Sequence, residues 1–240
     1  MDPNIQIRNL SFGYPGKIIF DSLTFAAEKG HSLVILGASG SGKTTLLKLA
    51  AGIIFPASGQ VLINGIDLGQ AAWAQAQTVY RELGFLFQDT ALIANMNISD
   101  NLALPLRYHG RGSPDEIALR VLEFLRRFGL ENYAESLPAQ ISMGLKKRAA
   151  LARALINQPR LLFLDDPLAE ADQRFQEMII QIARAQKSQG TLSLTTTSNF
   201  SDAVRLADHI ILIQQGKIIK TGSPAEVETA ALQALKEGQT

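Results

Sequence analysis

Residues 37–44 read G-A-S-G-S-G-K-T, and the segments on both sides restrict the fold that this loop can belong to. The preceding run, His31–Leu36, is apolar and β-prone, and the following run, Thr45–Ala50, favours a helix. A glycine-rich turn between a strand and a helix directs backbone N–H groups and the positive end of the helix dipole at phosphate oxygens. An ordinary Gly/Ser turn would explain some glycines, but neither the pair Lys43-Thr44 nor the flanking elements. We therefore expect a phosphate-binding loop within an α/β core.

Two side chains of this loop are expected to contact a nucleoside triphosphate and its metal ion. Lys43 would reach the β- and γ-phosphates, and the Thr44 hydroxyl would ligate Mg²⁺. The nucleotide-binding residues predicted here are Gly37, Ala38, Ser39, Gly40, Ser41, Gly42, Lys43, Thr44 and Thr45.

A pair of acids much further along the chain fits the same chemistry. Leu161–Leu164 is a short apolar run, as expected of a buried parallel strand, and Asp165 follows it directly. An acid at the C-terminal end of a strand, beside a phosphate loop, holds Mg²⁺ through water. The next residue, Asp166, can orient or deprotonate an attacking water. A turn of sequence Asp-Asp-Pro is common by itself, but the loop and the strand together favour the functional interpretation.

Composition excludes several other classes of protein. The net charge is +1 without a long basic block, so no nucleic-acid-binding surface is expected. There is no cysteine, which excludes disulfides and thiolate metal sites. The N-terminus does not resemble a signal peptide, and no apolar stretch approaches the length of a membrane span. These features predict a cytoplasmic protein that can still dock on a membrane protein.

The order of predicted elements gives a three-layer α/β core that carries an antiparallel β-layer and a helical insertion. Residues 98–156 read mainly helical. One helix there has clear ends, because Ser113 can cap it, Pro114 suits its first turn and Gly129 stops it. Strands are predicted over residues 5–10, 18–20, 23–25, 59–63, 83–87, 161–164, 191–196 and 210–214, with further helices over 173–188, 201–207 and from Ser223.

Several short motifs resemble those of ABC-transporter ATP-binding subunits, and they follow that family's order over nearly the whole chain. They are Tyr14 before the β-layer, the phosphate loop, Gln88 after a strand, I-S-M-G-L at residues 141–145, the strand ending at Asp165, A-E-A-D at 169–172 and T-S-N at 197–199. The helical segment 148–155 is also similar to that family. Residues 100–107 are similar to subunits of lipid- and lipoprotein-trafficking transporters.

The resemblance implies one ABC-type ATP-binding domain over residues 1–240. Its three-layer P-loop NTPase (RecA-like) core and antiparallel β-layer would be built from residues 1–88 and 157–240. Residues 89–156 would form the inserted α-helical subdomain that contains the altered signature.

The resemblance also assigns roles to individual residues. Tyr14 would stack on adenine, or it is an aromatic packed in a turn. Gln88 would face Mg²⁺ and water, or it is an exposed polar residue at the end of a strand. Ser142 would cap a helix whose N-terminus points across a dimer interface at the other subunit's γ-phosphate. The two lysines at 146–147 are expected to be solvated.

Four positions depart from the family pattern, and they concern hydrolysis more than binding. Asp166 stands where the family has a catalytic Glu, so the carboxylate is withdrawn by roughly 1.5 Å. A misplacement of about 1 Å can slow a reaction on the order of a hundredfold. Ser198 occupies the switch position that is normally His. In the signature L-S-G-G-Q, Met143 replaces the first Gly and would crowd the γ-phosphate, Leu145 replaces the Gln, and Gly144 is retained with the preceding Ser.

The leading interpretation is therefore an ATP-binding subunit with tight Mg·ATP binding and slow hydrolysis, peripheral on the cytoplasmic face of the membrane. It would dimerise around two ATP molecules, as a homodimer or as a heterodimer with another ATP-binding subunit, and drive a separate integral membrane subunit. The catalytic candidates are Asp166, Gln88 and Ser198, the metal ligands are Thr44, Gln88 and Asp165, and the further nucleotide contacts are Tyr14, Ser142 and Gly144.

Three alternatives stay open. One is a catalytically weak ATP-binding clamp that regulates a more active partner. Another is a non-transport ABC ATPase, although the chain has neither long coiled coils nor a second cassette. The phosphate loop alone also allows a kinase, in which the helix after residue 142 and the strand before Asp165 have no natural role.

Overall fold

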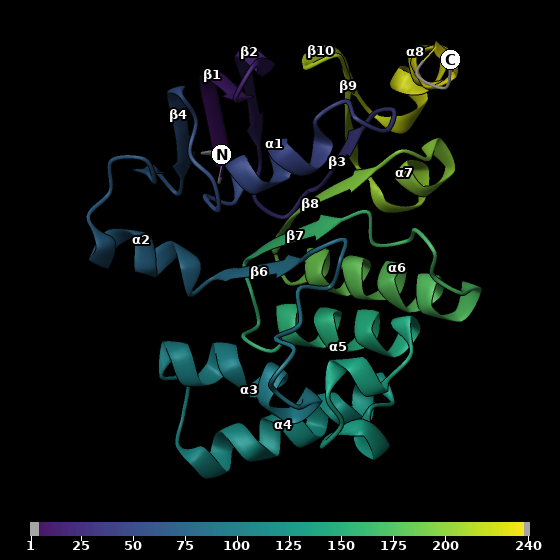
Figure 1. Ribbon diagram of the computed structural model, residues 1–240. Coiled ribbons are helices and arrows are strands. Elements are labelled where there is room, and N and C mark those ends of the chain that lie inside the picture. The colour runs from purple at the N-terminus through teal and green to yellow at the C-terminus, as the bar shows by residue number, and fades with distance from the viewer. Residues whose placement is uncertain (1–4, 238–240) are drawn as a thin grey trace.

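The computed structural model describes residues 5–237, and its central element is a six-stranded sheet (Figure 1). In order across this sheet the strands are β10 (Lys217–Gly222), β9 (His209–Gln214), β3 (Ser32–Leu36), β8 (Leu192–Thr197), β7 (Leu161–Asp165) and β6 (Leu83–Leu86). All neighbouring strands are parallel except β10 and β9. The C-terminal ends of β3, β6, β7 and β8 therefore lie along one edge of the sheet, which is where ligands bind in open α/β sheets.

A second, antiparallel sheet packs against one face of the first. Its strands, in order, are β2 (Lys17–Ala27), β1 (Ile5–Tyr14), β4 (Ser58–Ile63) and β5 (Ile66–Asp67). The strands expected at 18–20 and 23–25 are one continuous strand, because β2 pairs with β1 through several shifts of register. Ser22, with a φ of +56°, lies between the two expected segments. Helices α1 (Lys43–Ala50) and α2 (Trp73–Tyr80) contribute to the apolar core on this side.

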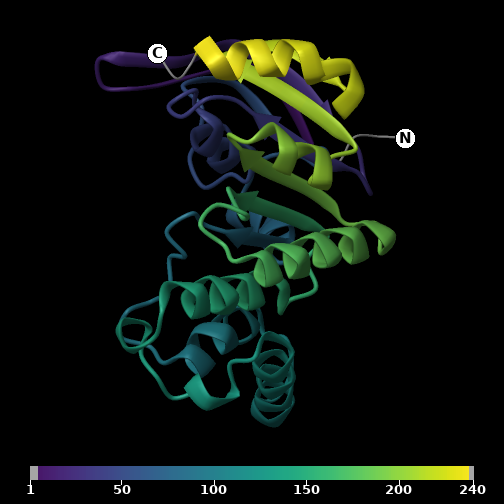
Figure 2. The same ribbon diagram turned by 90° about the vertical axis from the view of Figure 1, so that its right-hand side faces the viewer.

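Helices cover the opposite face and extend beyond β6 (Figure 1 and Figure 2). They are α3 (Ile98–His109), α4 (Pro114–Phe128), α5 (Met143–Leu155), α6 (Gln173–Ser188), α7 (Phe200–Leu206) and α8 (Pro224–Glu237), with short 3₁₀ turns η1 (Glu131–Tyr133) and η2 (Pro138–Gln140). The central strand is buried on both faces: Leu33 and Ile35 belong to one core, Val34 and Leu36 to the other. The expected three-layer α/β fold with an antiparallel sheet and inserted helices is confirmed.

The helix with the clearest sequence signals has the bounds expected for it. Ser113 accepts a hydrogen bond from the Glu116 backbone N–H, and Glu116 accepts one from the Ser113 N–H in return. Gly129 ends α4 with a left-handed φ of +65°.

The elements that sequence reasoning did not predict are α2, β5 and β10, which are short or lie at a sheet edge and carry few apolar residues at regular spacing.

No helix within the described residues 5–237 combines the length and the apolar character that crossing a bilayer requires.

A buried amide shapes the loop between β6 and α3. Asn101 lies in α3 and is fully buried. Its Oδ1 accepts from the Ile93 N–H at 2.8 Å, and its Nδ2 contacts the carbonyls of Ile93, Met96 and Asn97 at 3.0–3.1 Å. Because buried polar groups need partners, this side chain replaces the backbone pairing that an irregular loop lacks.

We expect Asn101→Leu to destabilise the protein by about 2–4 kcal/mol, because it leaves the Ile93 N–H and neighbouring carbonyls unpaired. For a domain of this size, that is a fall in Tm of roughly 4–16 °C. Differential scanning calorimetry measures the change. Asn132→Leu, the same substitution at an exposed position in η1, is the matched control. Equal Tm values for the two variants would contradict the structural role given to Asn101.

Candidate nucleotide-binding site

The loop between β3 and α1 has a shape that its glycines permit. Gly42 precedes α1 with a φ of +102°, and a Cβ there would lie 2.8 Å from the Phe20 ring. A Cβ on Gly37 would lie 2.4 Å from the carbonyl oxygen of Ile213. No side chain caps α1, so the first amides of this helix are left for another acceptor. An anion at this position would meet both those amides and the positive end of the helix dipole.

A cavity of about 280 Å³ opens beside this loop. Its walls come from the phosphate loop, from the ends of β6, β7 and β8, and from one residue of β2. The lining residues are Ile19, Ser39, Gly40, Gly42, Lys43, Thr44, Thr45, Gln88, Asp165, Asp166, Thr196 and Ser198.

Three hard oxygen donors meet at one side of the cavity. Thr44 Oγ1 donates to Asp165 Oδ1 at 2.9 Å, although the two residues are 121 positions apart. Thr196 Oγ1 donates to the same carboxylate oxygen at 2.6 Å, and Asp165 is only 3% exposed. Hydroxyl and carboxylate oxygens beside a phosphate site are the donor set that Mg²⁺ prefers, because this ion takes few protein ligands and completes its shell with phosphate and water. The residues present therefore fit a Mg²⁺ ion bound together with a nucleotide.

Lys43 brings a positive charge to the same cavity. Its Nζ donates to the carbonyls of Gly37 and Ala38 at 2.8 and 2.9 Å, which holds the ammonium over the loop. Burial lowers the pKa of Lys43, while the nearby carboxylates of Asp166 and Asp165 act in the opposite direction. The lysine is thus partly desolvated, which strengthens its interaction with a phosphate.

Asp166 directly follows β7 and lines the same cavity. Its backbone N–H donates to the carbonyl and hydroxyl oxygens of Thr196 at 3.2 and 3.0 Å. Its φ is +47°, a conformation that Asp adopts more readily than most residues. Burial raises the pKa of the Asp166 carboxyl, and the charges of Asp165 and Asp202 raise it further. The charge of Lys43 and a hydrogen bond with the Thr197 side chain act in the opposite direction and lower this pKa.

Comparison with known proteins shows the family to which this chain belongs. The family model described as "ABC transporter" matches residues 20–169, a segment that contains the phosphate loop, Gln88, Asp165 and Asp166. The chain belongs to the ABC transporter family. Over 227 residues it is 35% identical to the spermidine/putrescine import ATP-binding protein PotA of Nitrosospira multiformis, which covers 94% of this chain and 61% of that protein.

Two further comparisons bear on this ABC-family chain. It is 32% identical to the intermembrane phospholipid transport system ATP-binding protein MlaF of Haemophilus influenzae, covering 93% of this chain and 85% of that protein. It superposes on the dimeric, ADP- and Pi-bound ATP-binding cassette MJ0796 with a TM-score of 0.85 at 28% identity, covering 92% and 98% of the two chains. The chain spans about three fifths of the length of the polyamine-transport relatives it matches.

In this ABC cassette, most of the residues predicted from the phosphate loop and the strand ends lie together. Gln88 and Ser198 line the cavity together with Asp165 and Asp166. Tyr14 does not line it: the ring is half-exposed near the β1–β2 turn and makes an edge contact with Phe12 at 5.2 Å. Ser142 and Gly144 do not line it either; Ser142 caps α5 by accepting from the Leu145 N–H at 3.4 Å. Their predicted contacts with nucleotide stay predictions.

Two residues of the site were missed by sequence reasoning, and one expectation was wrong. Thr196 donates to the Asp165 carboxylate and accepts from the Asp166 backbone N–H, and Ile19 forms an apolar wall. A Thr-rich strand and an apolar hairpin residue carry no specific signal in the sequence. Lys147 was expected to be solvated. Its side chain is instead 12% exposed, and Nζ donates to the Ala169 carbonyl at 2.5 Å, because α5 packs beside the loop that follows β7.

Proposed function

We propose that this protein is the ATP-binding subunit of an ABC transporter, located on the cytoplasmic face of the membrane, where it binds Mg·ATP and hydrolyses it slowly. The observation that carries the proposal is the meeting of Lys43, Thr44 and Asp165 in one cavity at the end of the central strand. Family membership supports the assignment to a transporter.

Binding is expected to depend on the phosphate loop. The uncapped amides of α1 and the Lys43 ammonium would hold the phosphates, and Ile19 would limit access of water from one side. Thr44 and Asp165 would hold Mg²⁺, which supplies charge neutralisation at the phosphates. Thr196 keeps the Asp165 carboxylate in place through its short hydrogen bond.

The hydrolytic step would depend on the residues at the strand ends. Asp166 would accept a proton from water, or orient that water, with Gln88 and Ser198 as further polar groups in the same cavity. Ser198 offers neither the charge nor the proton exchange of an imidazole near neutral pH. The short carboxylate of Asp166 and the exposed Met143 at the start of α5 also support slow turnover.

Two copies of this cassette, or one copy and a related ATP-binding subunit, would close around two ATP molecules. The dimeric form of the solved cassette that this chain resembles supports this part of the proposal. Ser142 and Gly144 lie at the N-terminus of α5 outside the chain's own cavity, as a contact with the other subunit's nucleotide requires. The membrane subunit would be a separate chain.

The cargo belongs to the same proposal, and two classes have support. Lipid or lipoprotein trafficking is supported by the segment 100–107 and by the likeness to the phospholipid-transport protein. Polyamine import is supported by the 35% identical relative. The membrane subunit determines cargo, so its identity distinguishes the two classes.

The test is affinity purification of the tagged chain from detergent-solubilised membranes, followed by ATPase assays of the purified complex. We expect a polytopic membrane protein to co-purify, and slow ATP hydrolysis that Asp166→Asn abolishes while Mg·ATP binding is retained. Repeated recovery with soluble partners alone would overturn the transporter assignment. A fast rate that Asp166→Asn leaves unchanged would overturn the proposal of slow catalysis by this residue.

A further inference from the structure

The loop that follows β7, residues 166–172, has a shape that its own backbone does not favour. We refer to it as the Asp166 loop. Two of its non-glycine residues, Asp166 and Glu170, have left-handed φ values of +47° and +53°. Such residues persist only where surrounding groups hold them in place. Since Asp166 begins the loop and lines the cavity, any relaxation of the loop would move its carboxylate.

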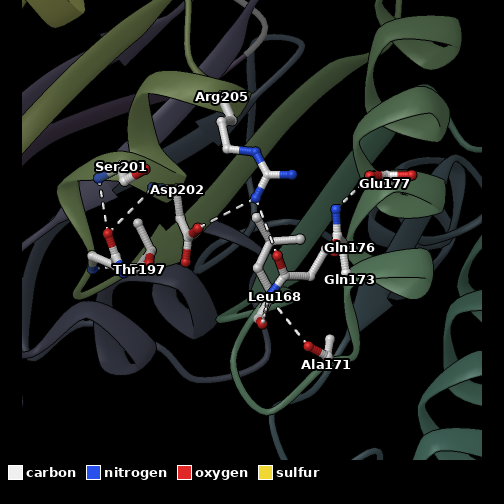
Figure 3. A network of polar contacts seen from close by, with 10 residues as sticks. Leu168, Ala171, Gln173, Gln176, Glu177, Thr197, Ser201, Asp202 and Arg205 are labelled. Carbon is white, nitrogen blue, oxygen red and sulfur yellow. Dashed lines mark hydrogen bonds and ion pairs between the residues drawn. The ribbon is translucent and has the colours of Figure 1, made fainter.

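A side chain of α6 binds the loop and is itself held by a side chain of α7 (Figure 3). Gln176 Nε2 lies 3.2 Å from the carbonyl oxygens of Leu168 and Ala171, to which it donates. The other end of the same amide, Oε1, accepts from Arg205 Nη1 at 3.1 Å. Arg205 in turn lies 3.8 Å from Asp202. The amide of Gln176 therefore has a fixed orientation, because the guanidinium can only donate to its oxygen.

A lysine from α5 also binds the loop. Lys147 Nζ donates to the Ala169 carbonyl at 2.5 Å, and its side chain is nearly buried. The nearby Glu170 carboxylate, 3.8 Å away, is 83% exposed, so this ion pair contributes little. The charge-assisted bond to the carbonyl is the stronger contact. Three carbonyls of one short loop are thus bound by two side chains from different helices.

The two side chains come from elements that also carry other parts of the site. Lys147 belongs to α5, which begins at the Ser142 cap. Gln176 is tied through Arg205 to α7, which begins just after Ser198. Bonds that only stabilised the fold would not need to converge on the residues that follow Asp166. Here they hold the middle and the end of the loop, at Leu168, Ala169 and Ala171, relative to both neighbouring elements.

We propose that Lys147 and Gln176 are positioning residues that hold the Asp166 carboxylate in place by binding the carbonyls of the Asp166 loop. The inference rests on the proposed hydrolysis of ATP at this site. Neither side chain lines the cavity.

Gln176→Glu is the variant that tests the role of the Gln176 N–H donors most specifically. It keeps the size of the side chain and an oxygen for Arg205, but it replaces both N–H donors by an oxygen that faces two carbonyls. Lys147→Met similarly keeps the apolar stem and removes the donor. For each variant we expect kcat for ATP to fall about tenfold to a hundredfold, since a shift of about 1 Å at a reacting group has effects of this size. KM for ATP should change less than about twofold, because the phosphate loop is untouched.

Matched variants distinguish the positioning of the Asp166 carboxylate from a general loss of protein stability or activity. Gln181→Glu makes the same substitution on the exposed face of α6 and should leave kcat unchanged. Lys147→Arg retains a charged donor and should recover most of the activity that Lys147→Met loses. Hydrogen–deuterium exchange gives a readout independent of hydrolysis: peptides covering residues 166–172 should exchange about tenfold faster in Gln176→Glu and Lys147→Met.

The experiment uses the full chain with its co-purifying subunit. Normal kcat and normal exchange in both variants would overturn the inference, as would a loss of kcat that Lys147→Arg does not recover. If the unmutated complex binds ATP without hydrolysing it, the proposed function fails instead. Exchange across the Asp166 loop then decides the inference by itself: faster exchange in the variants supports it, and unchanged exchange overturns it.

Discussion

Lys43→Met is expected to weaken Mg·ATP binding by at least about a hundredfold. Methionine keeps an unbranched side chain of similar length but removes the ammonium that lies over the phosphate loop at 2.8–2.9 Å from two of its carbonyls. A hydrogen bond to a charged group contributes about 1.5–3 kcal/mol, and two such bonds to phosphate oxygens correspond to a factor of about 10² to 10⁴ in affinity. Burial of the ammonium places the loss toward the upper part of this range.

Isothermal titration calorimetry with Mg·ATP measures this effect. Lys48→Met is the matched control, because Lys48 lies on the same helix but does not line the cavity. Circular dichroism of both variants verifies the fold. An affinity for Lys43→Met within a few-fold of the unmutated chain would contradict the assignment of this loop as the phosphate site.

Asp166→Glu is expected to accelerate ATP hydrolysis by about tenfold to a hundredfold. The extra methylene moves the carboxylate outward by roughly 1.5 Å, into the cavity that Asp166 already lines. The same substitution should lower stability by about 1 kcal/mol. The reason is the φ of +47°, which Asp tolerates better than Glu.

Steady-state phosphate release at saturating ATP measures the change in kcat, and thermal unfolding measures the change in stability. Asp21→Glu, at an exposed position of β2, controls for the added methylene. A rate for Asp166→Glu equal to or below that of the unmutated chain would show that the short side chain does not limit turnover.

The parts of the fold that the sequence predicted are those in which local signals agree. For α4, a capping residue, a first-turn proline and a terminal glycine act within one segment, and the helix has the expected ends. In β10, by contrast, Lys217–Gly222 is mostly exposed and forms a strand only because it pairs with β9. Its structure depends on a partner strand rather than on its own pattern of apolar residues.

The contacts of the site likewise divide into those that the sequence predicts and those that it does not. Thr44 and Asp165 could be paired from sequence, because parallel strands bring their C-terminal ends to one edge whatever lies between them. The hydrogen bonds that Lys147 and Gln176 donate could not be predicted from the sequence, since they depend on how closely helices approach a loop. Carbonyl oxygens occur at every residue, so the sequence gives no sign of which ones a distant side chain will bind.

The position of β3 also has a consequence for how the chain is made. This strand is flanked by β8 and β9, whose residues are synthesised about 160 or more positions later. At translation rates of about 5–20 residues per second, the β3 segment waits on the order of 10–30 s before either neighbour is available. During that interval its two apolar faces need protection by chaperones or by early packing on the antiparallel sheet. The nucleotide pocket is therefore among the last parts of the molecule to form on the ribosome.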